Sequence, residues 1–372
     1  MIVQFGTSRF LQAHVDLMAS QARDAGQDVP PITIVQTTGD AERARRLVTF
    51  ADAEGFPVIL RGIEAGKAVD QTVQVRSVIG GISAVTDWPP LVELVAGQAR
   101  FLVSNTGDTG YHILLEDRER PAAGQAPGGF VPKLTALLHA RWQWGGAPIT
   151  LLPCELVPRN GDVLRGLVLG LARDWGLEQG FAAWLESCLW ISTLVDRIVS
   201  TPLEPAGAVA EPYALWAVER QPGLVMPFTH PQLVLTDDLE PFERLKLHIL
   251  NLGHTWLAQQ WHEGGADPAL TVRAMMEDGV TLPALLSLYV QEVVPGFAMR
   301  GLGKEAEAYV ETTLDRFANP YLDHRLADIY SHHRAKIERR VTGFIDWVRT
   351  ETPDLALPRL EALAHSVSET AA

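Results

Sequence analysis

The sequence predicts an α/β fold in which an N-terminal, Rossmann-like, doubly wound parallel sheet is followed by an all-helical C-terminal domain. Two observations support this prediction. In the first part of the chain, short apolar runs alternate with longer amphipathic runs, which is typical of parallel strands buried between helices. Later in the chain, the apolar residues recur at helical spacing. The 372 residues suffice for two domains, and we expect them at residues 1–232 and 233–372.

The order of these runs gives the expected elements. In the first domain we expect strands at residues 2–5, 31–37, 57–63, 72–79, 101–104 and 149–153, and helices at residues 9–21, 40–50, 91–96, 131–142 and 162–175. Residues 57–63 and 72–79 alternate like strands of a meander or hairpin, and residues 201–232 are rich in Pro, Ala and Gly, as in a connector. In the second domain we expect one strand at residues 233–235 and helices at residues 242–261, 268–278, 283–294, 304–317, 322–348 and 358–366.

Composition excludes several classes of protein. The 31 Lys and Arg residues face 45 Asp and Glu residues, a net charge of −14, which argues against nucleic acid or an anionic membrane as a partner. An anionic ligand must therefore be held by a few local cations. Cys154 and Cys188 are expected to be reduced packing residues. We see no signal peptide and no apolar run of about 20 residues, so we expect a cytoplasmic monomer or small homo-oligomer with a small-molecule substrate.

Gly6 follows the first expected strand and precedes a helix, where a dinucleotide-binding fold places its phosphate turn. The segment Gly6-Thr7-Ser8-Arg9-Phe10 lacks the full G-x-G-x-x-G pattern, so an ordinary turn remains an alternative. The G-x-G at residues 301–303 lies between helices and is rejected as a nucleotide site.

The second expected strand ends in Gln36-Thr37-Thr38, where a residue that binds the adenine ribose is expected to be acidic. Asp40 follows shortly after. Arg43, Arg45 and Arg46 then either cover a 2′-phosphate or form a solvated helix face. We expect NAD as the cofactor, with NADP not excluded.

The segment from Lys246 to His254 contains the candidate catalytic residues. On an α-helix, Asn251 lies about 140° and His254 about 80° from Lys246, so the three share one side. A lysine in an apolar stripe is unusual because burying its charge is costly, and Gly253 within a helix costs roughly 1 kcal/mol relative to alanine. Either the lysine reaches solvent, or Lys246 is a general base, Asn251 a donor to the reacting oxygen and His254 a substrate contact.

Several motifs, in the same order along the chain, resemble those of the polyol-specific long-chain dehydrogenases, the mannitol dehydrogenase family. They are GTSRFLQAHVD at residues 6–16, SNT at residues 104–106, LVDRIVS at residues 194–200, K-x4-N-x2-H at residues 246–254 and RFANPY at residues 316–321. The resemblance implies the roles given above for Lys246, Asn251 and His254. It also implies NAD binding by a set of residues at the strand ends: Gly6, Thr7, Ser8, Arg9, Phe10, Thr37, Ser104, Asn105 and Thr106.

The resemblance further implies substrate contacts by Asp196, Arg197, Lys336 and His324, and a metal-independent reaction. Within the family, Pro153-Cys154-Glu155-Leu156 and His324 look most like the tagaturonate reductase (altronate oxidoreductase) branch. Leu156 stands where mannitol dehydrogenases carry an Asn that stabilises the reacting oxygen. We therefore expect an oxidoreductase that interconverts a secondary alcohol and a ketone of a sugar acid or polyol. Alternatives are mannitol 2-dehydrogenase or fructuronate reductase activity, or a non-catalytic NAD-binding sensor or scaffold.

Overall fold

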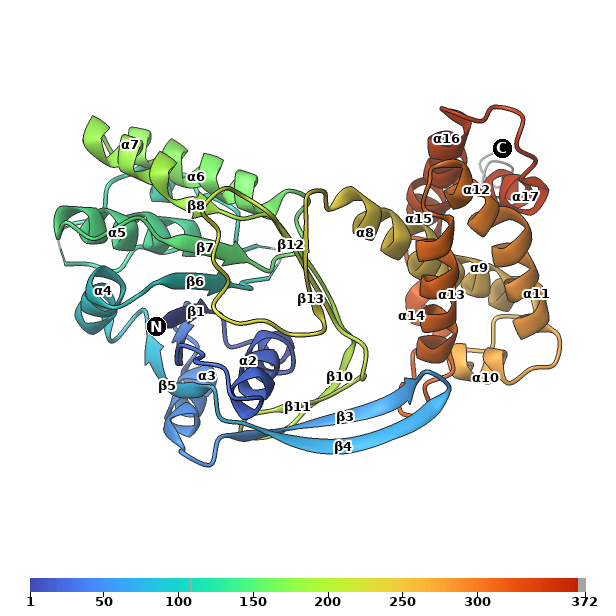
Figure 1. The fold of residues 1–372 in the computed structure, drawn as a ribbon, viewed down its shortest axis with the longest axis horizontal. Helices are drawn as coiled ribbons and strands as arrows, with labels where there is room; N and C mark the ends of the chain where they lie inside the picture. Colours follow the sequence, from blue (N-terminus) through green and yellow to red (C-terminus); the bar gives the residue numbers. More distant parts are fainter. Residues whose placement is uncertain (108, 123, 367–372) are drawn as a thin grey trace. The chain divides into compact units, whose positions relative to one another are not determined.

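The computed structural model describes residues 1–107, 109–122 and 124–366, without the side chains of residues 41–43, and forms two compact units (Figure 1). The first unit comprises Met1–Leu60, Gln71–Ala210 and Ala214–Leu239. The second comprises Arg61–Asp70, Glu211–Tyr213 and the chain from Glu240 onward. Two short segments that precede Glu240 in the sequence therefore belong to the helical unit.

The main sheet of the first unit has six parallel strands in the order β5-β2-β1-β6-β7-β8 (Figure 1). The strands are β1 (Ile2–Phe5), β2 (Ile32–Gln36), β5 (Val78–Ser83), β6 (Phe101–Ser104), β7 (Thr150–Pro153) and β8 (Leu189–Trp190). The chain winds outward from β1 in one direction and then from β6 in the other, so the order reverses between these two strands. This arrangement confirms the predicted doubly wound sheet and places its switch point at the carboxyl ends of β1 and β6.

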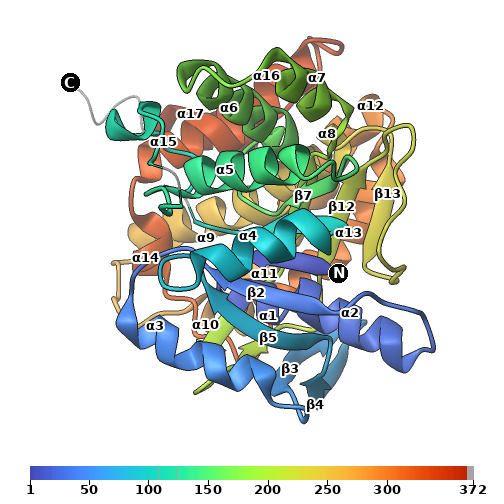
Figure 2. The same cartoon turned by 90° about the vertical axis from the view of Figure 1, so that its left-hand side faces the viewer.

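Helices cover both faces of this sheet. The helices are α1 (Arg9–Gln12), α2 (Val15–Asp24), α3 (Ala41–Arg46), α4 (Trp88–Gly97), α5 (Phe130–Gln143), α6 (Asn160–Asp174) and α7 (Gln179–Ser187), with 3-10 turns η1 (Leu47–Ala51) and η2 (Glu116–Arg118). Val3 and Phe5 of β1 pack against α4, α5 and α6, which lie side by side in Figure 2. Gln4, which alternates with them, donates a hydrogen bond to Asp16 of α2 on the opposite face (3.2 Å).

Two smaller sheets complete the strands, in the orders β10-β11-β3-β4 and β13-β12-β9. Their strands are β3 (Phe56–Glu64), β4 (Lys67–Val75), β9 (Thr193–Asp196), β10 (Val199–Pro202), β11 (Ala208–Ala210), β12 (Leu215–Glu219) and β13 (Leu233–Thr236). The single strand expected at residues 72–79 is wrong, because the chain leaves β4 at Val75 and enters β5, in a different sheet, at Val78. The expected connector at residues 201–232 is also wrong, since it contains β11, β12 and the end of β10.

In the second unit, the described elements from Glu240 onward are helical. They are α8 (Glu240–Leu245), α9 (Leu252–Glu263), α10 (Val272–Met276), α11 (Thr281–Leu288), α12 (Val294–Met299), α13 (Gly303–Phe317), α14 (Leu326–Tyr330), α15 (His333–Ile337), α16 (Gly343–Arg349) and α17 (Pro358–Ser366), with π-helical turns η3 (Lys246–Asn251), η4 (Tyr289–Val293) and η5 (Glu338–Thr342). The one long helix expected at residues 322–348 is interrupted, because Ser331 and His332 leave the helix and His332 adopts a φ of 53°. The predicted helical domain is confirmed.

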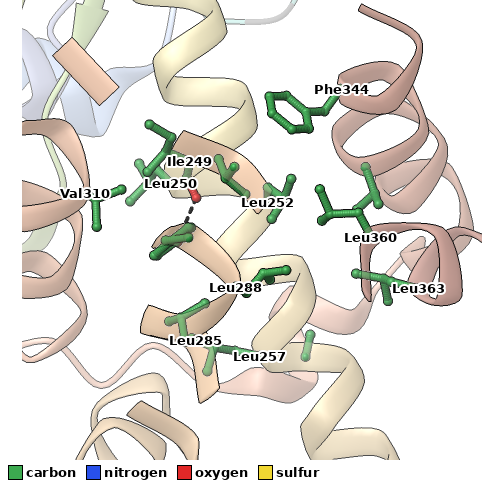
Figure 3. Packing of buried hydrophobic residues seen from close by; sticks show 14 of the residues in the cluster. Ile249, Leu250, Leu252, Leu257, Leu285, Leu288, Val310, Phe344, Leu360 and Leu363 are labelled. Atoms are coloured by element: carbon green, nitrogen blue, oxygen red, sulfur yellow. Dashed lines mark hydrogen bonds between the residues drawn. The ribbon is translucent and has the colours of Figure 1, made fainter. Parts of the chain in front are cut away.

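The core of the second unit is built around η3 and α9. Figure 3 shows Ile249, Leu250 and Leu257 of this helix among Leu285 and Leu288 of α11, with Phe344, Leu360 and Leu363 from the C-terminal helices also part of the cluster. The helix Thr281–Met299 is long and apolar enough by composition to cross a membrane. The prediction that the chain has no apolar run of about 20 residues did not take this helix into account. Its residues Leu285, Leu288, Tyr289, Val293 and Phe297 are fully buried in this core, so packing within the unit accounts for its apolar character.

The segments Arg61–Asp70 and Glu211–Tyr213 are tied to the end of α13. Asn319 donates to the Arg61 carbonyl (3.3 Å), and the Gly66 amide donates to Asp315 (3.1 Å). Arg316 forms a bidentate ion pair with Glu211 (2.9 and 3.0 Å), and both side chains are only 2% exposed. Arg316 and Asn319 of the RFANPY motif therefore tie these two segments to α13 and the residues that follow it.

Candidate active site

The switch point of the sheet is formed by two backbone segments in close contact. Gly6 directly follows β1 and has a φ of 113°, a conformation that side chains with a Cβ rarely adopt. A Cβ at Gly6 would overlap the carbonyl oxygen of Asn105, which directly follows the neighbouring strand β6. Only glycine therefore allows the two strand ends to approach, as close backbone packing around a dinucleotide requires.

Side chains fix the geometry of this turn. Ser8 caps α1 by accepting a hydrogen bond from the Leu11 amide, and its hydroxyl donates to Oδ1 of Asn105 (both 3.3 Å). Thr7 is half-buried, and its carbonyl accepts a bond from Gln12. The structure thus brings Gly6, Ser8 and Asn105 together, and their contacts with a cofactor remain predictions.

The other two residues of the predicted turn point to protein partners. Arg9 pairs with Glu204 (2.8 Å) and also donates to the Pro205 carbonyl (3.2 Å). Phe10 stacks on the ring of His14 at 4.8 Å. Their contacts with a cofactor remain predictions.

Glu155 organises the segment from Ser104 to Thr106, and the sequence reading missed this role. Its buried carboxylate accepts hydrogen bonds from the Ser104 hydroxyl (3.0 Å), from the amide and hydroxyl of Thr106 (both 3.1 Å) and from the Tyr111 hydroxyl (3.3 Å). Burial raises the pKa of Glu155, while the bonds from Ser104 and Thr106 oppose that rise. The sequence signal for this role was an acidic residue shortly after β7, the buried strand beside β6. The next residue, Leu156, is 74% exposed.

At the end of β2, Gln36 occupies the position where an acidic residue was considered. Its side-chain amide donates to the Asp40 carbonyl (2.7 Å), and Thr37 beside it is half-buried. Arg46 forms an ion pair with Glu204 (3.3 Å), whereas Arg45 is exposed. The side chain of Arg43 lies outside the described residues.

Asp196 and Arg197 are both buried at the end of β9. Arg197 donates to the Ala13 carbonyl, at the break between α1 and α2, and to Gln232 (3.2 Å). Burial, with a further contribution from the Arg197 guanidinium, lowers the pKa of the neighbouring His14 to about 3. Arg197 thus has a structural role in the first unit, and the substrate contacts of both residues remain predictions.

The candidate catalytic residues of the second unit lie on a widened helical turn. Lys246 and Asn251 are the first and last residues of the π-helical turn η3, and His254 lies on α9, which continues the same helix. Because a π-helix bonds residue i to residue i+5, Asn251 lies one full turn after Lys246. The angle of about 140° expected for a regular α-helix is therefore wrong, and the true geometry brings the two side chains closer to one face.

A π turn disrupts the regular hydrogen bonds of the backbone carbonyls. Here side chains from other helices donate hydrogen bonds to these carbonyls. The Tyr289 hydroxyl donates to the Ile249 carbonyl (2.9 Å). The Asn251 carbonyl accepts bonds from the Thr255 hydroxyl (3.0 Å) and from Nη1 of Arg340 (3.2 Å). The turn is therefore held from η4 and η5 as well as from its own helix. π turns of this kind are frequent at functional sites.

Gly253 explains how Tyr289 reaches this helix. A Cβ at Gly253 would overlap the Tyr289 hydroxyl and crowd the ring of Phe317. The sequence correctly indicated that something approaches the helix at this glycine, and the group is a tyrosine of the same unit.

His254, His324 and Lys336 form a cluster next to this turn. The rings of His254 and His324 are 5.0 Å apart and nearly perpendicular. Burial lowers the pKa of His324; Asp328 opposes this shift, and Lys336 adds to it. Nζ of Lys336 donates to the Ile329 carbonyl (2.6 Å) and to Ser331 (3.4 Å). The second unit thus brings together the predicted catalytic residues and two of the predicted substrate residues.

A doubly wound sheet with a glycine turn at its switch point, together with a helical unit that carries a Lys-Asn-His set, defines the class of two-part Rossmann-fold dehydrogenases. The model of the mannitol dehydrogenase Rossmann domain matches residues 1–225, and that of the mannitol dehydrogenase C-terminal domain matches residues 238–359. The chain belongs to the mannitol dehydrogenase family and is a dehydrogenase acting on CH–OH groups.

Named relatives and solved structures agree with this assignment. An altronate oxidoreductase of Halalkalibacterium halodurans is 31% identical over 97% of this chain and 74% of the relative. One of Bacillus subtilis is 31% identical over 91% of this chain and 73% of the relative. The chain thus spans about three quarters of their length.

Two crystal structures share the fold. A D-sorbitol dehydrogenase in substrate-free form has a TM-score of 0.78 at 21% identity, covering 95% of this chain and 76% of its own. The Pseudomonas fluorescens mannitol 2-dehydrogenase, in complex with NAD and D-mannitol, has a TM-score of 0.72 at 19% identity, covering 98% of this chain and 77% of its own. At this identity the likeness concerns the fold.

Proposed function

We propose that the chain is an NAD-dependent oxidoreductase that interconverts altronate and tagaturonate, a sugar acid and its keto form. The observation that carries this proposal is the 31% identity to an altronate oxidoreductase over 97% of the chain. The Lys-Asn-His set beside Lys336 and His324 supports it, because the set combines a base, hydrogen-bond donors and a cation within one unit.

The residues at the switch point fit a dinucleotide. The close approach of Gly6 to Asn105 leaves no room for a Cβ, as a backbone cradle for a pyrophosphate requires. Gly6 to Phe10 would hold the phosphates, Thr37 the adenine ribose, and Ser104 to Thr106 the nicotinamide side. When bound, the nicotinamide accepts the hydride in oxidation and donates it in reduction.

Lys246 serves as the proton-transfer group. In oxidation its amine takes the proton of the reacting hydroxyl, and in reduction its ammonium returns that proton to the forming alcohol. Asn251 donates a hydrogen bond to the reacting oxygen, and His254 contacts a neighbouring hydroxyl. Asp196 accepts hydrogen bonds from substrate hydroxyls. Since Leu156 has no polar group, Asn251 carries the stabilisation of the reacting oxygen without an Asn at position 156.

The test follows NADH absorbance with tagaturonate, fructuronate and fructose. The wild type should turn over tagaturonate best, and Lys246→Ala should lower kcat by roughly 100- to 10,000-fold, the range of general acid–base catalysis. NADH binding, measured by fluorescence titration, should persist in this variant. Lys304→Ala, which removes an exposed lysine of α13, is the matched control and should behave like the wild type.

Three results would contradict the proposal. Unchanged turnover in Lys246→Ala would remove the lysine from the reaction. Preference for fructose or fructuronate would assign a different substrate within the family, and NADH binding without turnover of any of the three would favour a sensor.

A further inference from the structure

Arg340 differs from the other arginines in the interior of the second unit. Among the described residues, each other buried or half-buried arginine of this unit pairs with a carboxylate, whereas Arg340 is half-buried and forms no such pair. The pairs are Arg61–Asp70, Arg244–Glu240, Arg273–Glu277, Arg300–Glu351 and Arg316–Glu211. Removing an unpaired charge from water is costly, so this cation calls for a counter-charge from a ligand.

The guanidinium of Arg340 is anchored next to the candidate catalytic turn. Nη1 donates to the Asn251 carbonyl (3.2 Å) and to the Thr255 hydroxyl (3.0 Å). Nε and Nη2 make no hydrogen bond to a described residue, and neither is shut off from solvent. One end of the fork is therefore fixed, while three N–H groups remain for a ligand.

Lys336 lies four residues before Arg340 on the same helix, so the two cations are about one turn apart. Burial and the nearby Arg340 lower the pKa of Lys336, and burial together with Arg339 lowers that of Arg340 to about 10. Like charges at this spacing destabilise each other, and an anion between them would relieve the repulsion. His324 and His254 lie on the same side, next to Lys336.

We propose that Arg340 and Lys336 together bind the carboxylate of a sugar acid, and that Arg340 makes the site selective for the acid over the neutral polyol. A planar guanidinium and an ammonium suit the two oxygens of one carboxylate. The net charge of −14 repels anions, so a local pair of cations is required. This inference rests on the proposed function, whose substrate class it specifies.

The experiment compares altronate with altritol, the polyol that has CH₂OH in place of the carboxylate. Affinities are measured by calorimetry in the presence of NAD, and KM values by NADH absorbance. Arg340→Gln should weaken altronate binding roughly 10- to 100-fold, as loss of charge-assisted hydrogen bonds implies, and should weaken altritol binding much less. Arg340→Lys, which keeps the charge, should retain most of the affinity and covers the case in which Arg340→Gln fails to fold.

Two controls separate charge from positioning. Arg339→Gln removes the adjacent exposed arginine and should change altronate affinity less than about twofold. Thr255→Val removes the hydroxyl that donates to the Asn251 carbonyl and accepts a bond from Arg340, without changing the charge. It should lower altronate affinity much less than Arg340→Gln does.

The outcomes distinguish this inference from the proposed function. Equal altronate affinity in wild type, Arg340→Gln and Arg339→Gln would overturn the inference. If the wild type still turns over altronate, the proposed function stands. Equal losses for altronate and altritol, or as large a loss in Thr255→Val, would also overturn it. Altronate binding that depends on Arg340 but leads to no turnover would support the inference and contradict the function. A wild type that binds no sugar acid would overturn both.

Discussion

The two units use a glycine for the same purpose but hold the neighbouring backbone differently. In the first unit, Gly6 allows close contact between two strand ends, whose positions follow from the register of β1 and β6. In the second, Gly253 admits the Tyr289 hydroxyl to a widened helical turn, where it satisfies the Ile249 carbonyl. A sheet thus fixes its site through backbone pairing, whereas a π turn depends on side chains from other helices.

The side chains that hold the π turn are distant from it in sequence. Tyr289 lies 40 residues from Ile249, and Arg340 lies 89 residues from Asn251. The geometry of the catalytic turn is therefore sensitive to substitutions far along the chain. At the switch point the partners are also distant in sequence, since Ser8 lies 97 residues from Asn105, but their positions follow mainly from the backbone pairing of β1 with β6.

The largest effect is expected from Gly6→Ala, which tests the strand-end contact. The overlap with the Asn105 carbonyl and the strained φ together should lower the free energy of unfolding by about 2–6 kcal/mol. NADH binding should weaken by at least about tenfold. Urea denaturation and fluorescence titration measure these changes.

Gly26→Ala is the matched control for Gly6→Ala. Gly26 also has a positive φ, of 86°, but a Cβ there would meet no atom within 4 Å. It should cost only the backbone strain, about 1–2 kcal/mol, and leave NADH binding unchanged. Equal losses in the two variants would show that the contact with Asn105 contributes nothing.

Gly253→Ala tests the contact of the second unit and should have the next largest effect. Crowding against the buried Tyr289 should lower the free energy of unfolding by about 1–3 kcal/mol and reduce kcat/KM by displacing the π turn. Gly166→Ala, in α6 with open space around its Cα, should instead stabilise by about 0.5–1 kcal/mol. Denaturation curves that shift in the same direction would contradict this reading.

The smallest expected effect is the change in the free energy of unfolding over one pH unit. It has opposite signs for two buried groups, Asp16 and His248. Burial raises the pKa of Asp16 to about 8 from 3.8, so the folded state binds the extra proton and stability falls as pH rises from about 4 to 8. Burial lowers the pKa of His248 to about 4 from 6.5, so the unfolded state binds the extra proton and stability falls as pH drops from 6.5 to about 4.

Two variants isolate these contributions. Each group changes the free energy of unfolding by at most about 1.4 kcal/mol per pH unit. Relative to wild type, Asp16→Asn should gain stability as pH rises, and His248→Gln should gain stability as pH falls below 6.5. The measurement is the free energy of unfolding in steps from pH 4 to pH 8. A variant that parallels the wild type throughout would show that its residue does not titrate as described.

The sequence sufficed to predict most of the fold. Strands such as Ile2–Phe5 and Phe101–Ser104 were predicted to the residue, because each is a short, mostly apolar run that alternates along the chain with longer amphipathic runs. Predictions were wrong where local pattern is ambiguous. Residues 72–79 continue to alternate although the chain changes sheets, and the strand Ala208–Ala210 is only three residues long, with Val209 as its one β-branched residue.

The candidate site was predicted unevenly for the same reason. Lys246, Asn251 and His254 could be proposed because they share one helix and match the K-x4-N-x2-H motif of the family, and Gly6 because it follows a strand. The π turn, the bonds of Glu155 to Ser104 and Thr106, and the unpaired charge of Arg340 were not found. Each of these depends on a partner distant in sequence, which helical or strand periodicity does not report.

The segments Arg61–Asp70 and Glu211–Tyr213 have a consequence for how such proteins diversify. A chain divided at Leu239 would leave the helical portion without Glu211, the buried carboxylate that pairs with Arg316. Exchanging the C-terminal portion between relatives by a single crossover therefore separates partners that must coevolve. Recombination that keeps both internal segments with their helices preserves them.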